Sequence, residues 1–413
     1  MKLPTSSLEE WRYSRIDSLD LDRFEPAGPD TRPGGPHVAG SVPLVEAARL
    51  SAAEVTAVET VDGRLSVLAP AAGSGVEVTV LSQTSEQPQV EWSGGGLDAF
   101  GTANEAFSVD PILIEVTSSD RPATVVVAHH CLSDGLVSFP RVTVRTAPGA
   151  NLTLIEVLSG DAACLVVPVV DLDVAVNARV VYLGVQALGG RAWQIASQSS
   201  RVAAGASLTS GAVALGGDYA RVLTSSSLTG VGASSRLAAM YFASGSQMHD
   251  FRTVQDHKAR KTFSDLLYKG VVANKASSVY SGLIRVEKGA KGTKAFQTNR
   301  NLVLHEGARA ESVPNLEIEE NDVSCSHASA IGPVSEDERF YLHSRGVPPQ
   351  VADRLISVGF LTEVLEQLPL GALASHVEAA LSEKLATAEA AEAAEAAGSD
   401  RQFTAEPGRE ELT

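Results

Sequence analysis

Short runs of Val, Leu and Ile recur along the chain from Pro111 onward, and several of them alternate with polar residues. Examples are the runs PILIEV, RVTVRT, NLTLIEVL and RVVYLGVQAL. Side chains two positions apart lie on the same face of a strand, so this alternation predicts β-strands with one buried face. The pattern therefore indicates a mainly β protein.

A small residue followed by alanine recurs between these predicted strands. The first four of these alanines are 27 or 28 residues apart, and the last ones fall at a half-spacing of roughly 14 to 18. A fixed period of this length without helical periodicity is typical of a solenoid, in which each coil stacks on the next and shares one apolar core. Glycine and asparagine suit the tight corners because they adopt positive φ at little cost. The corner pairs are Gly149-Ala150, Asn177-Ala178, Gly205-Ala206, Gly232-Ala233, Lys258-Ala259, Lys275-Ala276, Gly289-Ala290 and Gly307-Ala308.

We therefore predict a parallel β-helix over residues 41–333. A leucine-rich repeat would carry the pattern L-x-x-L-x-L, which the sequence lacks. A β-sandwich is the structural alternative, but it would not repeat a corner on this period. We expect residues 1–40 to form a short N-terminal helical or loop segment, because EEWRYSRI allows one or two helical turns and GPDTRPGGP cannot hold regular structure.

Helical signals replace the strand pattern near the end of this region. Ser335 followed by Glu338 is a capping box, which predicts a helix that ends at Gly346. The prolines that begin at Pro348 suit the first turn of a second helix, and amphipathic segments follow it. These signals predict a C-terminal helical domain over residues 334–385.

The chain is acidic, with 33 Lys and Arg against 50 Asp and Glu and a net charge of −17. Because phosphate binding needs a basic surface, this balance disfavours nucleic acid and anionic membranes as partners. Residues 386–413 are rich in Ala and Glu and have no apolar stripe that could dock. We expect this segment to be a disordered tail or a frayed helix.

Several features of the sequence predict a cytoplasmic protein. No run approaches the roughly 18 apolar residues that a membrane span needs. The N-terminal residues MKLPTSSLEEWRY lack the apolar stretch of a secretory signal. Three cysteines far apart in the sequence, Cys131, Cys164 and Cys325, do not form a disulfide framework, and they suit a reducing compartment.

Cys325 and His327 are the candidate site residues. They lie two positions apart in a predicted strand, so the thiol and the imidazole point to the same face. Thiolate and imidazole are suitable ligands for iron or another soft metal. An isolated Cys-x-His pair is more often part of the packing, and two ligands leave a metal site incomplete. The remaining ligands would have to come from elsewhere, such as a partner chain.

Two other groups of residues could carry chemistry. His129 and Cys131 would point to one face of a strand and His130 to the other, so this cluster favours a structural role. Asp171 and Asp173 share a predicted strand face and could be the acidic pair of a β-helical carbohydrate-active enzyme. Such enzymes usually need a denser cluster of charges, so a solvated face is the simpler interpretation.

Several blocks of sequence resemble the SufB/SufD family of iron–sulfur cluster assembly proteins. In order, the blocks are HDFRTVQDHKARKTFSDLLYKGVV, SSVYSGLIRVEKGAKGTKAFQTNRNLVL, PNLEIEENDVSCSHASAIG and FYLHSRGV. The resemblance is strongest over residues 245–362 and extends more loosely to EEWRYSRI near the start. Within the family the chain is similar to the SufD branch, because Asn299 stands where the SufB branch carries a cysteine. The sequence Cys325-Ser326-His327 likewise stands where SufB has H-E-A-T-T.

The resemblance implies a right-handed parallel β-helix with a C-terminal helical domain. It also implies a SufB-like partner that pairs through the ends of the β-helices and a SufC ABC-type ATPase that docks on the C-terminal helices. His327, with Cys325, would face the SufB interface as a candidate ligand of a nascent iron–sulfur cluster that is bound transiently and shared with the partner. The family's complex is also associated with flavin.

A non-enzymatic scaffold subunit is the function that this resemblance implies. ATP hydrolysis is expected from the SufC partner, because GAKGTK does not match the phosphate-binding loop G-x-x-x-x-G-K-[ST]. Two alternatives stay open at the level of sequence. One is a SufB-like chain that holds a cluster alone, and the other is a carbohydrate-active enzyme that uses Asp171 and Asp173.

Overall fold

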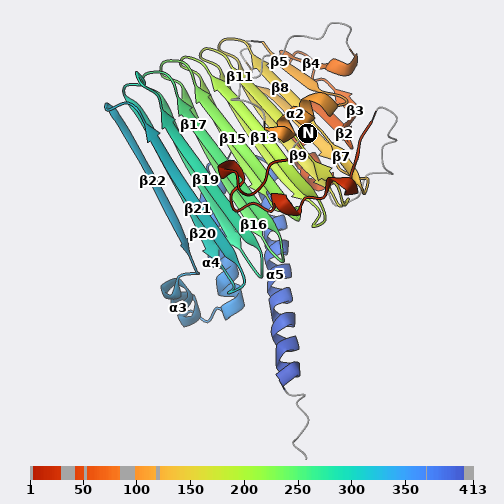
Figure 1. The fold of residues 1–413 in the computed structure, drawn as a ribbon, viewed down its shortest axis with the longest axis vertical. Coiled ribbons are helices and arrows are strands. Elements are labelled where there is room, and N and C mark those ends of the chain that lie inside the picture. The colour runs from red at the N-terminus through yellow and green to blue at the C-terminus, as the bar shows by residue number, and fades with distance from the viewer. Residues whose placement is uncertain are drawn as a thin grey trace, which may run out of the picture.

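The computed structural model describes residues 3–28, 42–50, 54–83, 98–117, 121–368 and 370–403. The described residues form two long β-sheets that face each other, with the C-terminal helices below them in the view (Figure 1). Consecutive strands alternate between the two sheets along most of the chain, and each strand pairs in parallel with the strand two positions away. This is the arrangement of a β-solenoid, so the predicted mainly β fold with a stacked parallel core is confirmed.

The two sheets are named A and B. In spatial order, the main path of sheet A contains β21 (Arg309–Ile318), β19 (Ser277–Val286), β17 (Met248–His257), β15 (Tyr219–Leu228), β13 (Trp193–Val202), β11 (Val169–Val174), β8 (Arg141–Thr146), β5 (Ile112–Val116) and β4 (Val76–Val80). Three short strands join sheet A beside this path: β1 (Glu25–Pro26), β7 (Leu136–Ser138) and β10 (Leu165–Val166). Sheet B contains β22 (Val323–Gly332), β20 (Thr293–Val303), β18 (Phe263–Val272), β16 (Ser234–Ala243), β14 (Ser207–Ala214), β12 (Arg179–Leu188), β9 (Asn151–Gly160), β6 (Ala123–His130), β2 (Thr56–Val61) and β3 (Arg64–Ala69). The pairs β2–β3 and β4–β5 are antiparallel and close the N-terminal end of the stack.

The repeated corners lie where the sequence predicts them, with one exception. Seven of the eight corner alanines are buried, and Asn177 adopts φ 57° at its corner. The exception is Ala259, which is only half-buried. The left-handed turn residue of that coil is Lys261, with φ 57°, and Thr262 takes the buried position that follows it. The predicted corner at Lys258-Ala259 is therefore wrong by three residues, because the coil begins its next strand only at Phe263.

The described residues contain five α-helices, which flank the solenoid, and four short 3₁₀ turns. The α-helices are α1 (Val42–Arg49), α2 (Ala99–Phe107), α3 (Glu336–Ser344), α4 (Pro349–Leu365) and α5 (Leu373–Phe403). The 3₁₀ turns are Glu9–Trp11, Ile16–Ser18, Leu21–Arg23 and Leu81–Gln83. The predicted capping box is confirmed in part, because the Ser335 side chain accepts a hydrogen bond from the Glu338 backbone N–H at 3.4 Å.

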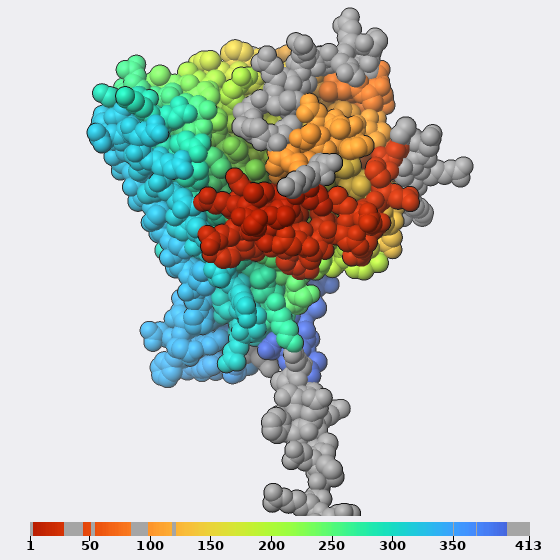
Figure 2. Space-filling view, in the orientation of Figure 1, coloured from red at the N-terminus to blue at the C-terminus, as the bar shows by residue number. Residues whose placement is uncertain are grey.

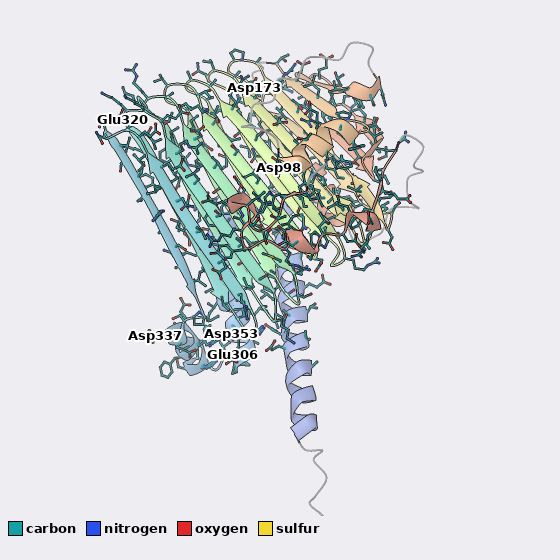
Figure 3. The ribbon with its side chains drawn as sticks, in the orientation of Figure 1. Asp98, Asp173, Glu306, Glu320, Asp337 and Asp353 are labelled. Atoms are coloured by element: carbon teal, nitrogen blue, oxygen red, sulfur yellow. The ribbon has the colours of Figure 1, made fainter. Side chains whose placement is uncertain are left out.

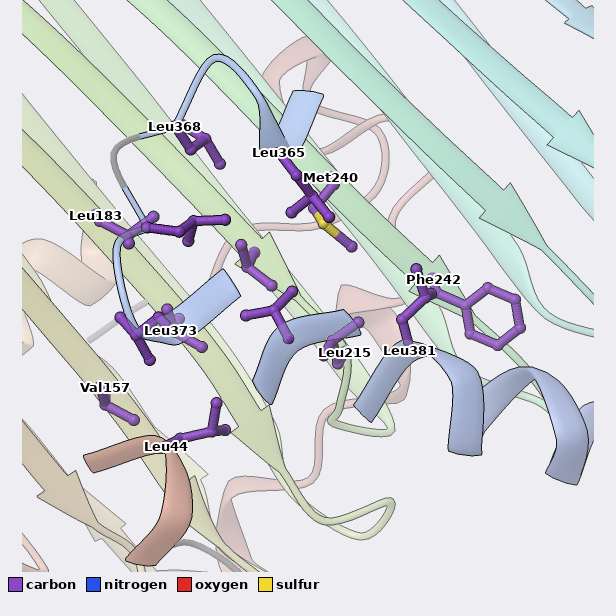
Figure 4. Packing of buried hydrophobic residues seen from close by; sticks show 14 of the residues in the cluster. Leu44, Val157, Leu183, Leu215, Met240, Phe242, Leu365, Leu368, Leu373 and Leu381 are labelled. Carbon is purple, nitrogen blue, oxygen red and sulfur yellow. The ribbon is translucent and has the colours of Figure 1, made fainter. Parts of the chain in front are cut away.

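Helices α1, α4 and α5 cover the outer face of sheet B. Outward residues of the strands pack against apolar residues of these helices in one continuous cluster, as Leu215 and Met240 do with Leu365 and Leu381 (Figure 4). Burial of apolar area on this scale is the main contribution that holds the helices to the sheet. The apolar faces of the amphipathic C-terminal segments therefore pack against sheet B.

Two lysines, the buried Lys269 and the half-buried Lys384, fasten α4 and α5 to sheet B. The Lys269 amine on β18 donates to the Phe360 carbonyl at 2.9 Å and contacts the Glu363 carboxylate. The Lys384 amine on α5 donates to the Phe242 carbonyl and to Gln247 Oε1, both at 2.7 Å. Buried charges are stable only when they are paired or hydrogen-bonded, and these contacts satisfy that requirement.

The docked part of α5 extends beyond residue 385, into the segment that the sequence suggests to be a tail. Ala388 is buried in the cluster on sheet B, and Asn274 Nδ2 donates to the Ala388 carbonyl at 3.0 Å and to Glu392 at 3.1 Å. Arg354 on α4 pairs with Glu389 at 2.6 Å. The contacts that hold this part of α5 are thus polar as well as apolar. Residues 404–413 lie outside the described residues.

The N-terminal segment lies across the outer face of sheet A (Figure 2, red). Trp11 is buried there, with the Arg221 guanidinium 3.8 Å from the centre of its ring. Asp250, which is fully buried, accepts hydrogen bonds from Arg221 at 2.7 Å and from Arg252 at 2.6 Å. Arg221 also donates to the Glu10 carbonyl at 2.6 Å. A buried carboxylate between two arginines therefore fixes the EEWRY segment.

We predict that Asp250→Asn lowers the free energy of unfolding by about 3 kcal/mol, because removing one partner leaves two buried arginines without their counter-charge. Asp173→Asn is the matched control, since Asp173 pairs with Arg201 at a part-exposed site, and its loss should stay within about 1 kcal/mol. Urea unfolding followed by circular dichroism measures both. Equal losses in the two variants would contradict this account of the buried network.

Stability should also fall in acid because of a buried histidine. Burial lowers the pKa of His257 to about 4 from an ordinary value of 6.5. Below pH 6.5 the unfolded chain therefore binds a proton that the folded chain does not, and stability is lost as the pH falls toward 4. The expected loss is about 3 kcal/mol for this group.

The test compares urea unfolding of the wild type, His257→Gln and His343→Gln at several pH values from 7 to 4. His257→Gln should reduce the slope of the free energy of unfolding against pH, by up to the contribution of one proton taken up on unfolding. His343 is exposed on α3, so His343→Gln should leave the slope as it is in the wild type. An unchanged slope in His257→Gln would show that this group does not titrate as predicted.

Candidate functional site

The solenoid ends at β21 and β22, the last strands of sheets A and B. Among the described residues, neither strand has a second neighbour on its outer edge. The inward faces of these strands are consequently open: Ser329 on β22 donates to Ser312 on β21 at 2.8 Å across the gap between the sheets, and both side chains are reached by solvent. Ile318 and Ile331, at the ends of the same strands, are 42% and 44% exposed.

Cys325 and His327 lie on this inward face of β22, beside each other and before Ser329. In the ladder between β20 and β22, Cys325 pairs with Ala295 and His327 pairs with Gln297. The Cys325 side chain is half-buried and packs against the apolar cluster of Ala295 and Ile284, whereas His327 is exposed. The structure thus places the two predicted site residues together at the open end of the solenoid.

The surroundings of Cys325 disfavour metal binding by its thiol. Burial raises the pKa of the Cys325 thiol above its ordinary value of 9.0, although a hydrogen bond with the Ala295 backbone partly opposes this. The thiol is therefore protonated at neutral pH, and metal binding would have to displace that proton. Among the described residues, no group of three or more His, Cys, Asp or Glu side chains has the geometry to hold a metal ion.

Polar side chains lie directly behind this face, on β20. Asn299 is buried and donates to the Tyr268 carbonyl at 3.3 Å, and it accepts from the Asn301 amide at 2.9 Å. Tyr241 completes the network by donating to Asn301 at 2.6 Å. The Asn299 amide is therefore used in interior hydrogen bonding.

Gln297 is a residue of this region that the sequence reasoning missed. It is buried, it is the ladder partner of His327, and neither atom of its amide has a hydrogen-bond partner among the described residues. The signal was present in the sequence, since Gln297, Asn299 and Asn301 are polar residues at alternate positions of a strand that should face the core.

The cluster around His129 has structural partners, in agreement with the simpler interpretation of the sequence. His129 Nε2 lies 3.2 Å from Glu156 in the interior, and its Nδ1 lies 2.7 Å from the Thr60 hydroxyl. His130, on the opposite face of β6, lies 3.3 Å from Glu59. Cys131 is buried in a small apolar cluster that includes Cys164, and their interaction and burial raise the pKa of the Cys131 thiol. A protonated, buried thiol is unreactive.

Asp171 and Asp173 each have an arginine partner. Asp171 is buried, accepts a hydrogen bond from Ser199 and lies 3.6 Å from Arg141. Asp173 lies near the end of β11 (Figure 3), where Arg201 pairs with it at 2.6 Å. The two carboxylates are thus neutralised separately, which disfavours them as the acidic pair of a carbohydrate-active enzyme.

A second exposed surface lies on α3 and α4. Arg339 holds the two helices together by pairing with Asp353 at 2.6 Å, just below the sheets in Figure 3. Large apolar side chains on these helices remain open to solvent: Phe340 is 75% exposed, Tyr341 58% and Leu355 51%. Large exposed apolar side chains gathered on one pair of helices can mark a site of protein association. No helix among the described residues is long and apolar enough to span a membrane.

The chain is similar to proteins of iron–sulfur cluster assembly. The family model for the SUF system FeS cluster assembly, SufBD core domain, matches residues 129–360. The iron–sulfur cluster assembly protein SufD of Escherichia coli is 27% identical over 394 residues, which cover 93% of this chain and 89% of that protein. SufD of Bacillus subtilis is 35% identical over 141 residues, or 34% of this chain and 32% of that protein.

A SufBD family protein of Mycobacterium tuberculosis is 35% identical over 206 residues, or 48% of this chain. The match spans only about half of that relative's length, 52%. The core-domain match includes β22 with Cys325 and His327, and it ends within α4. The chain therefore belongs to the SufB/SufD family of iron–sulfur cluster assembly proteins, and its SufD relatives support its assignment to the SufD branch.

Proposed function

We propose that this chain is a SufD-like scaffold subunit that assembles iron–sulfur clusters in the cytoplasm together with a SufB-like subunit and a SufC-type ATPase. The observation that carries the proposal is the position of Cys325 and His327, side by side on the open last coil of the solenoid. The subunit itself is non-catalytic, and the cluster is a product that it holds transiently and shares with its partner.

The open end of the solenoid is suited to a partner of the same shape. Edge strands such as β21 and β22 carry backbone N–H and C=O groups that can pair with another strand. A SufB-like subunit that presents the end of its own β-helix would satisfy these groups and cover Ile318 and Ile331. Such pairing would enclose His327 and bring further ligands to it, which the pair of Cys325 and His327 needs to complete a site.

The surface of α3 and α4 is suited to the ATPase. Phe340, Tyr341 and Leu355 supply apolar anchors there. Because Lys269 ties α4 to β18 through the Phe360 carbonyl, a displacement of the helices by the ATPase would act on sheet B near its open end. We infer that nucleotide-driven motion of the ATPase is transmitted in this way to the interface that contains His327. Flavin binding would be a property of the whole complex.

Replacing His327 tests the proposed site. In the reconstituted complex, His327→Ala should lower the yield of cluster about tenfold or more. Loss of a residue that only hydrogen-bonds to a metal ligand already reduces metal affinity or activity by about this factor, and loss of the ligand itself should reduce the yield at least as much. The yield is measured from visible absorption and from bound iron and sulfide after anaerobic assembly. Ser326→Ala is the control, since Ser326 is exposed on the opposite face of the strand. A full yield from a correctly assembled His327→Ala complex would rule out the proposed role.

Replacing Phe340 tests the docking surface separately. Phe340→Ser should weaken binding of the SufC-type ATPase about thirtyfold, the effect of losing a central apolar anchor of about 2 kcal/mol. Val231→Ser is the matched control, because Val231 is 49% exposed at a corner of the solenoid, away from the helices. Isothermal titration calorimetry with the purified ATPase gives both affinities. The surface is misassigned if the two variants bind equally well.

A further inference from the structure

A cavity of about 50 Å³ lies between the two sheets in the middle coils of the solenoid. Small residues border it at inward positions, among them Gly184, Ala196 and Ala212. Packed protein interiors rarely leave a void larger than one water molecule. A space of this size in the shared core therefore needs an explanation.

Three buried glutamines line the cavity and leave polar atoms without partners. Gln186, Gln194 and Gln198 are each 4% exposed. Gln186 Oε1 accepts from the Gly216 N–H at 2.8 Å, and Gln198 Oε1 accepts from the Ser210 hydroxyl at 3.0 Å. The Nε2 groups of these two glutamines and the Oε1 of Gln194 have no hydrogen-bond partner among the described residues.

The concentration of such atoms at one place indicates a bound polar ligand. A buried polar group without a partner costs about 1–3 kcal/mol, so three around one cavity would be a large cost in a protein of ordinary stability. The unpartnered atoms comprise two donors and one acceptor, so the ligand must both accept and donate hydrogen bonds. A metal cation does not meet this requirement, because it can satisfy only the acceptor.

The charge and volume of the cavity limit the class of ligand further. Glu156 is the one charged side chain among the residues that line it, and its carboxylate already accepts from the Tyr182 hydroxyl at 2.5 Å. An anion would be repelled there, which leaves a small neutral molecule. A volume of about 50 Å³ holds about four water molecules at roughly 10–15 Å³ each.

We propose that the middle of the solenoid contains a cluster of about four ordered water molecules, bound by Gln186, Gln194 and Gln198. The waters complete the hydrogen bonding of the glutamines and make the middle coils a hydrated segment of the core. This inference does not depend on the proposed role in cluster assembly, because it rests only on residues of the interior.

A crystal structure of the full chain at high resolution tests the proposal without any substitution. The expected result is discrete density in the cavity, within hydrogen-bonding distance of Gln194 Oε1 and of the Nε2 atoms of Gln186 and Gln198. A crystal pressurised with xenon should take up no xenon at this place. Density for an elongated molecule, or xenon in a cavity without water density, would overturn the proposal.

The same waters can be counted in solution by ¹⁷O magnetic relaxation dispersion, which detects long-lived internal water. The double variant Gln194→Met and Gln198→Met fills similar volume with apolar atoms, so it should lose at least about two long-lived waters relative to the wild type. Gln83→Met, at an exposed position, is the control and should lose none. An equal number of waters in a folded double variant and in the wild type would count against the site.

Discussion

The stacking of coils is the constraint on which the rest of this structure depends. No coil can bury its apolar face alone, so each one is stable only between neighbours. The parallel ladders run without interruption from β5 to β21 in sheet A and from β2 to β22 in sheet B. The antiparallel β2–β3 and β4–β5 pairs close the first coil. Among the described residues, no neighbour covers the outer side of the last coil. The candidate site residues lie on that coil.

The segments outside the solenoid are held by hydrogen-bonded ionisable side chains as well as by apolar contact. Asp250 fixes the N-terminal segment on sheet A, whereas Lys269 and Lys384 fix the C-terminal helices on sheet B. Apolar packing is not directional, but a buried charge is stable only when its partners lie in the right place. These few ionisable groups therefore favour one docking position for each segment, whereas apolar packing alone would allow several.

The open last coil and the helical surface connect the fold to the proposed function. His327 is exposed on an edge strand, and Cys325 beside it is half-buried and protonated. An arrangement of this kind is poor at holding a cluster tightly, and it suits a subunit that contributes ligands only when a partner encloses them. The apolar residues of α3 and α4 lie near the same end of sheet B, so two partners could act on one coil.

The sequence by itself determined the local features of this protein. The period of the corners predicts the solenoid, the capping box at Ser335 predicts α3, and the spacing of Cys325 and His327 places them on one face. These are properties of neighbouring residues, and short-range geometry decides them. The sequence pattern did not place the corner near Lys261 correctly, because the length of each coil is adjusted to the coil on which it stacks. The partners of Asp250, Lys384 and Gln297 were likewise decided only by tertiary structure, since they lie on strands and helices far apart in the chain. Whether a polar residue is buried with a partner, buried without one or exposed depends on which coils stack around it.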